Sequence, residues 1–105
     1  MTLPVRLSAE AVAELDDAAT WYDEKRVGLG GEFMDAVEEA VEAIVRWPRS
    51  GSLVDGVPAD LQVRRLPVMR FPYHLAYAVD DDQVRILAIA HDRQRPEYWA
   101  PRTDG

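Results

Sequence analysis

Residues 71–91 read FPYHLAYAVDDDQVRILAIAH, and this stretch decides the fold of the chain. From Phe71 to Val79, aromatic or aliphatic side chains occupy every second position, which is the period of a β-strand with one buried face. Residues 80–82 are three aspartates and form a polar turn. From Val84 to His91 both alternating sets of side chains are mostly apolar, which is typical of a central strand. The stretch therefore predicts two neighbouring strands joined by a short turn.

Two helices are predicted before this pair of strands. Apolar side chains recur at helical spacing from residue 9 onward, directly after Ser8, a residue type that favours the N-cap. We expect Gly28, and then Gly30 and Gly31, to end this helix and to allow a tight turn. The second helix is predicted to end where Pro48 disfavours helical geometry. The short connection predicts an antiparallel helical hairpin.

Two further extended segments complete the predicted fold. Residues 3–7 and 61–66 are expected to form strands, and the Gly-, Pro- and Ser-rich residues 48–60 are expected to form a loop. The predicted order is β-α-α-β-β-β. It defines an α+β fold, in which the helical hairpin packs on one face of a small, mostly antiparallel sheet. We expect one domain over residues 1–105, with the hairpin at about 8–47, the sheet at about 61–91 and a tail at 92–105.

Composition limits the classes of function. The chain has 48% hydrophobic and 30% charged residues, which are ordinary globular values, and it has no cysteine. No apolar run is long enough to cross a membrane and no secretory leader is visible, so we expect a cytoplasmic protein. The formal charge is −7, with −8 in residues 1–60 and +1 in residues 61–105. This balance disfavours nucleic-acid binding, although the second half can still offer a neutral or basic surface.

One face of the strand from Phe71 to Val79 is the predicted functional surface. The aromatic side chains should face the helices, so His74 should point to the opposite face among small neighbours. That pattern predicts a shallow, open surface. Alternation allows only one of the adjacent residues Arg64 and Arg65 to share it. Arginine suits acidic or phosphate groups because its planar fork binds two oxygens. The candidate residues for binding a partner are Arg64, Arg65, Arg70, His74, Arg93 and Arg95.

Several other residues have a structural interpretation. Arg93 and Arg95 can equally well pair with the acidic helix faces. His91 is interpreted as a buried histidine bonded to the backbone rather than as a base. Tyr98 and Trp99 are expected to pack the tail back onto the domain. The remaining large aromatic side chains are expected to pack within the hairpin: Trp21, Tyr22 and Trp47.

No cofactor or metal ion is expected. His74 and His91 lack the spacing of a helical zinc motif, and no carboxylate accompanies them in a metal-binding pattern. The sequence has no glycine-rich phosphate loop and no nucleophile elbow. Any chemistry therefore depends on arginine, histidine and tyrosine, which can transfer protons and stabilise an anionic phosphate.

Four segments carry a resemblance to a known family. They are GGEF at residues 30–33, WPRSG at 47–51, VRRLPVMRFPYHLAYAV at 63–79 and ILAIAHDRQRPEYW at 86–99. With them the chain resembles the RelE/ParE superfamily of toxins from type II toxin–antitoxin systems, over about residues 8–102. The most specific parts are FPYHLAY and the AH-x-R-x-R-P-E-Y-W ending. The resemblance is closer to the ParE-like branch, the plasmid-stabilisation proteins, than to RelE.

The resemblance implies two alternative activities. ParE-like members inhibit DNA gyrase and have no established nuclease activity, whereas RelE-like members cut mRNA on the ribosome. The lysines of the RelE type fall near Gln62 and Arg64, and its strand arginine falls at His74. Its later arginine is kept as Arg93, and its terminal tyrosine falls at Trp99. We rank gyrase inhibition first, mRNA cleavage second and an attenuated toxin third. Only for a nuclease, the implied catalytic set is His74, Arg64, Arg93 and Tyr98.

The resemblance also implies partners. A cognate antitoxin is expected to wrap its C-terminal segment around the toxin in a hetero-oligomer, while DNA gyrase or the ribosome is the target and no membrane is involved. The candidate surfaces for the antitoxin are the helical hairpin and the sheet face bearing His74, with Arg64 and Arg93. A segment that folds on binding needs apolar grooves and charged anchors.

Overall fold

A five-stranded mixed sheet forms the centre of the protein. The computed structural model describes residues 3–57, 59–80, 82–95 and 98–104. The strands follow the order β1-β5-β4-β3-β2, and β1 runs parallel to β5 while the other neighbours are antiparallel. This confirms the predicted α+β class and the central position of the last strand. The strands are β1 (Val5–Leu7), β2 (Ser52–Leu53), β3 (Arg64–Pro67), β4 (Tyr73–Val79) and β5 (Val84–His91).

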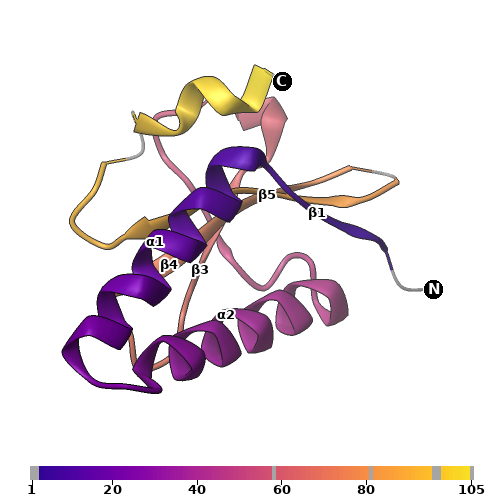
Figure 1. The fold of residues 1–105 in the computed structure, drawn as a ribbon. Coiled ribbons are helices and arrows are strands. Elements are labelled where there is room, and N and C mark those ends of the chain that lie inside the picture. Colours follow the sequence, from indigo (N-terminus) through magenta and orange to yellow (C-terminus); the bar gives the residue numbers. More distant parts are fainter. Residues whose placement is uncertain (1–2, 58, 81, 96–97, 105) are drawn as a thin grey trace.

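The two helices cover one face of this sheet, as Figure 1 shows. They are α1 (Ala9–Lys25) and α2 (Leu29–Arg46). Ser8 caps α1 as predicted, because its Oγ accepts a hydrogen bond of 3.0 Å from the N–H of Ala11. Gly28 precedes α2 with φ 92°, a left-handed conformation that glycine adopts without strain. The expectation that Gly30 and Gly31 belong to the turn is wrong, since both lie in the first turn of α2.

The short strands and turns differ from the sequence-based expectation. Residue 61 ends a 3₁₀-helix, Ala59–Leu61, and the strand expected at 61–66 begins only at Arg64. The predicted loop at 48–60 contains the two-residue strand β2, which pairs with β3 at the sheet edge. A last 3₁₀-helix, Ala100–Asp104, forms the C-terminal segment.

The first core lies between the helices and the sheet. It contains four aromatic rings in mutual contact, and their centroids are 5.0–6.2 Å apart. Phe71 and Tyr73 are among the positions that the period-two pattern assigns to the helix side, and for these two residues the prediction is confirmed. Phe33 is fully buried, and Tyr22 is nearly so. Edge-to-face contacts of this kind add about 0.5–1.5 kcal/mol to the effect of burial alone. The rings are Tyr22, Phe33, Phe71 and Tyr73.

A second core fills the opposite face of the sheet. Four alanines of β4 and β5 line this face and leave a hollow above the strands. The indole of Trp99 fills it and is only 1% exposed, and Figure 1 shows the C-terminal segment on the side of the sheet away from α2. The predicted packing of Trp99 onto the domain is therefore confirmed. The expected open surface is wrong, because small side chains left room for one large ring. The alanines are Ala76, Ala78, Ala88 and Ala90.

A β-bulge in β5 changes which side chains of this strand face each core. Ala76 pairs with Ala88 while the next residue, Tyr77, pairs with Ile86, so Leu87 is an extra residue without a partner in β4. The bulge moves Leu87 onto the second face beside Ala88. The alternation in β5 therefore changes phase there, which sequence periodicity does not reveal.

Two tryptophans expected in the hairpin core lie at the surface instead. Trp21 on α1 is 53% exposed and Trp47 at the end of α2 is 60% exposed. Trp21 contacts the edge of Tyr22 at a centroid distance of 5.1 Å, but it is not enclosed by α2. The expectation is thus correct for Tyr22 and wrong for both tryptophans. Exposed rings of this size are typical of interaction surfaces.

Candidate functional site

His74 is the centre of a three-residue polar cluster on the second face of the sheet. Its Nδ1 lies 3.0 Å from Oδ1 of Asp92, the residue that follows β5. The guanidinium of Arg65 lies 3.4 Å from the same ring nitrogen and 3.8 Å from the same carboxylate oxygen. The backbone N–H of Asp92 donates to the carbonyl of Pro72, which fixes the carboxylate beside the ring. The structure therefore joins Arg65 to His74 and adds Asp92, which sequence reasoning missed.

The imidazole of His74 is neutral at pH 7. Burial lowers the pKa of His74, although the hydrogen bond to Asp92 opposes this shift. We assign the single ring proton to Nδ1, because Asp92 is then a hydrogen-bond acceptor at the shorter of the two distances. Nε2 is then unprotonated. A carboxylate that orients an imidazole in this way is the arrangement of a general base.

Access to this ring is closed. His74 is only 3% exposed, whereas the side chains of Arg65 and Asp92 are 46% and 45% exposed. The cluster thus contains an acid–base pair and an arginine that suits a phosphate, but its imidazole is buried against the second core. Its immediate structural role is to link the ends of β3, β4 and β5.

The neutral, buried state of His74 predicts a pH dependence of stability. The unfolded chain binds a proton at His74 near its ordinary pKa of about 6.5, whereas the folded chain resists it. The contribution of His74 to the free energy of unfolding is therefore fully present above the pKa of the unfolded chain. It is lost as the pH falls from there through the lower pKa of the folded chain. We expect urea midpoints measured between pH 7 and pH 5 to fall less steeply in His74→Gln than in the wild type. Equal slopes in the variant and the wild type would contradict the prediction.

Arg64 does not belong to the His74 cluster. It pairs with Tyr77 across the sheet and lies on the helix side of β3. Its Nη1 donates to the carbonyls of Gly51 at 2.8 Å and Arg49 at 3.4 Å. The Tyr77 hydroxyl also holds this loop, because it donates to the Pro48 carbonyl at 2.8 Å and accepts from the Gly51 N–H. The expected surface that combines Arg64 with His74 and Arg93 is therefore wrong, and Arg64 anchors the loop after α2.

The other predicted arginines are dispersed. Arg70 has a left-handed φ of 72°, and its guanidinium lies 3.9 Å from Glu32 and 5.8 Å from the ring centroid of Phe71. Arg93 and Arg95 are exposed in the turn after β5. Neither forms an ion pair with another residue that the structure describes, so their expected pairing with the helix faces is not found there.

Tyr98 lies apart from the His74 cluster. Its ring packs on the second core, and the guanidinium of Arg102 lies 5.1 Å from its centroid. Burial, together with the nearby carboxylate of Glu14, raises the pKa of Tyr98 far above its ordinary value. A phenol with so high a pKa is a poor proton donor at neutral pH. This environment argues against the catalytic role that the nuclease alternative gives to Tyr98.

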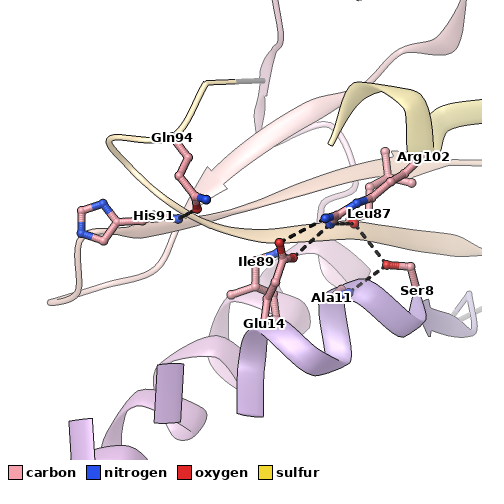
Figure 2. Close-up of polar contacts among 8 residues, drawn as sticks. All are labelled: Ser8, Ala11, Glu14, Leu87, Ile89, His91, Gln94 and Arg102. Carbon is pink, nitrogen blue, oxygen red and sulfur yellow. Dashed lines mark hydrogen bonds and ion pairs between the residues drawn. The ribbon is translucent and has the colours of Figure 1, made fainter. Parts of the chain in front are cut away.

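A polar network closes the part of the β5 edge that β1 leaves free (Figure 2). β1 ends opposite Ile86. Beyond that point the carbonyl of Leu87, freed by the bulge, accepts from Ser8 Oγ at 3.1 Å and from Arg102 at 3.0 Å. Glu14 accepts from the N–H of Ile89 at 3.1 Å and pairs with Arg102 at 3.1 Å. The network ties α1 and the C-terminal segment to β5.

His91 ends β5 at the rim of this network. Its backbone N–H donates to Oε1 of Gln94 at 3.0 Å, and its ring Nδ1 accepts from the N–H of Arg93 at 3.1 Å. The ring touches Tyr73 at a centroid distance of 5.1 Å. The predicted bond to the backbone is therefore present, but the ring is only half-buried, and Figure 2 shows it projecting beyond the strand.

The described residues provide no obvious metal centre. Among residues 3–57, 59–80, 82–95 and 98–104, no group of three or more histidine, aspartate or glutamate side chains is placed to hold a metal ion. Within the same ranges, no helix is both long and apolar enough to cross a membrane.

The fold and the sequence were both compared with those of known proteins. A solved structure described as a chromosomal ParDE toxin–antitoxin system from P. aeruginosa superimposes with a TM-score of 0.72, covering 86% of this chain and 96% of that chain at 21% identity. A family model for the ParE toxin of the type II toxin–antitoxin system parDE matches residues 5–96. The chain therefore belongs to the ParE toxin family, which confirms the sequence-based resemblance. Curated protein sequences give no match.

Proposed function

We propose that this ParE-family toxin acts by binding and inhibiting DNA gyrase, and that a cognate antitoxin neutralises it. The observation that carries the proposal is the second core. Trp99 fills the sheet face on which a nuclease of this superfamily would need open, basic groups, and His74 on that face is 3% exposed. A formal charge of −7 also opposes binding to ribosomal RNA, whereas a protein target tolerates it. A cytoplasmic location follows from such a target.

One specific observation favours mRNA cleavage as the second candidate. The Asp92–His74 pair beside Arg65 is a general base with a phosphate-binding group, which is the minimum for attack by a 2′-hydroxyl. It is not the family's nuclease set, since Arg64 faces the other side of the sheet and Tyr98 is a poor acid. A third candidate is an attenuated toxin that only binds its antitoxin.

Parallel assays of the two targets test the proposal. Purified toxin, freed of antitoxin, is added to gyrase supercoiling reactions and to ribosomes translating a defined mRNA. We expect supercoiling to stop near stoichiometric toxin, the mRNA to stay intact, and added antitoxin to restore supercoiling.

Two variants make the assays decisive. His74→Gln and Asp92→Asn remove the acid–base pair, so both should retain gyrase inhibition if they fold. Cleavage of mRNA that either variant abolishes would replace our proposal with the nuclease. Inactivity in both assays, with antitoxin binding intact, would identify the attenuated toxin.

A further inference from the structure

A groove of about 520 Å³ lies between α1 and the end of β5. Its α1 wall includes Asp17 and the half-exposed ring of Trp21. Its opposite wall includes Tyr73, Ile89 and His91 from the sheet. The groove therefore combines aromatic surface with an acidic side chain. It is separate from the buried His74 cluster, because none of the three residues of that cluster lines it.

On its groove side, β5 beyond Ile86 pairs with no strand among the residues that the structure describes. β1 ends opposite Ile86, so the outward N–H groups of Ile89 and His91 donate to side-chain oxygens, those of Glu14 and Gln94, at 3.1 and 3.0 Å (Figure 2). Side-chain acceptors protect this strand edge from pairing with another molecule, and the groove of about 520 Å³ runs beside it. A peptide could pair with this edge of β5 without any change in the sheet. A carbonyl of the peptide would replace a side-chain acceptor, such as Gln94 Oε1 at the His91 N–H.

The acidic side chains of the groove favour a positively charged group in the bound partner. Glu14 is already paired with Arg102, but Asp17 is exposed and forms no ion pair with any residue that the structure describes. Trp21 sits one turn along α1, and its ring already holds the Lys25 ammonium 4.7 Å from the centroid. An indole ring attracts a lysine or arginine cation, more strongly when the contact is partly desolvated, and the nearby Asp17 carboxylate adds an opposite charge.

The groove also offers donors to a peptide backbone. Nδ1 of His91 accepts from the N–H of Arg93, which leaves Nε2 as the ring nitrogen that can donate. This nitrogen and the amide of Gln94 can donate to carbonyls of a chain lying along β5. An extended segment with a basic side chain matches both sets of groups.

We propose that an extended segment of the antitoxin lies in this groove, with a lysine or arginine side chain held against Trp21 and Asp17. This inference rests on the proposed function, because it takes the antitoxin as the occupant. It moves the binding surface from the His74 face, where the second core leaves no room, to the side of α1. The acidic N-terminal half of the chain, with a net charge of −8, would then also steer a basic segment toward it.

Calorimetric titration of full-length toxin variants with the cognate antitoxin tests the groove. We expect Trp21→Ala and Asp17→Lys each to weaken binding by at least tenfold. Trp47→Ala removes an equally exposed tryptophan at the far end of α2, and Asp16→Lys makes the same change of charge one position outside the groove. Both controls should stay within about twofold of the wild type, with unchanged thermal unfolding.

The outcomes separate this inference from the function on which it rests. If the wild type binds the antitoxin but the groove variants behave like their controls, the groove is not the site and only this inference fails. If Asp17→Lys and Asp16→Lys weaken binding equally, long-range charge alone acts and the local pair is rejected. If the wild type does not bind the antitoxin, this inference and the antitoxin part of the proposed function fail together.

Discussion

Trp99→Ala should lower the free energy of unfolding by about 3–5 kcal/mol, the range measured when a fully buried large aromatic residue is truncated. The indole is 1% exposed and covers the alanine-lined face of β4 and β5. Those alanines cannot expand into the space it leaves, because they have no further side-chain atoms to move. A typical domain is stable by only about 5–15 kcal/mol, so the variant should unfold far below the wild-type temperature.

Urea and thermal unfolding, followed by circular dichroism, measure this loss. At about 4–8 °C per kcal/mol for a domain near this size, the midpoint should fall by more than about 10 °C. Trp47→Ala is the matched control, since its ring is 60% exposed, and it should change stability by less than about 0.5 kcal/mol. Similar losses in the two variants would mean that Trp99 does not close a second core.

The C-terminal segment that follows Trp99 is held to the rest of the protein by Arg102. Arg102 binds both the Glu14 carboxylate and the Leu87 carbonyl, so the tail is fixed to α1 and β5 at once. The side chains of Glu14 and Arg102 are only 22% and 18% exposed, so removing either partner would leave a largely buried charge without its counter-charge. The tail is thus part of the domain, as the Tyr98–Trp99 aromatic pair predicts.

Local pattern was sufficient for most of the fold. Period-two alternation identified β4 and the side that its rings face, and helical spacing with a Ser8 cap located α1. Both signals depend on neighbours in sequence, which is why one chain reveals them. The family resemblance came from short segments within these same elements. No comparable sequence pattern predicts which residues of different helices and strands contact one another.

The candidate site was harder to predict because it depends on pairing between strands. Alternation showed that only one of Arg64 and Arg65 faces His74, but the choice depends on the register of β3 with β4, which the sequence does not encode locally. Asp92 had one usable signal, its place directly after a strand expected beside β4. The open His74 face was misjudged for a different reason, since a row of alanines indicates both an empty surface and a socket for a distant ring.

Gly30→Ala and Gly31→Ala should have opposite effects on stability, although they lie next to each other in the first turn of α2. A methyl group on Gly30 would collide with the backbone oxygen of Ala19 and would lie 2.8 Å from Oδ1 of Asp23. The backbone of α1 cannot yield without separating the helices. The Gly30 N–H also donates to Asp23 at 2.7 Å, and that bond would be strained. We expect a loss of about 1–3 kcal/mol or more, as for other overpacked sites.

Gly31 is the matched control, because a methyl group there meets nothing within 4 Å. Alanine has a higher helix propensity than glycine and restricts the unfolded chain, so Gly31→Ala should stabilise the protein by about 0.4–1 kcal/mol. Chemical denaturation of the three proteins under one condition measures both changes. Equal stability of the two variants would show that the helices do not meet closely at Gly30. The Gly-Gly pair reads as a turn in the sequence, yet the physical reason for its first glycine is the contact between two helices.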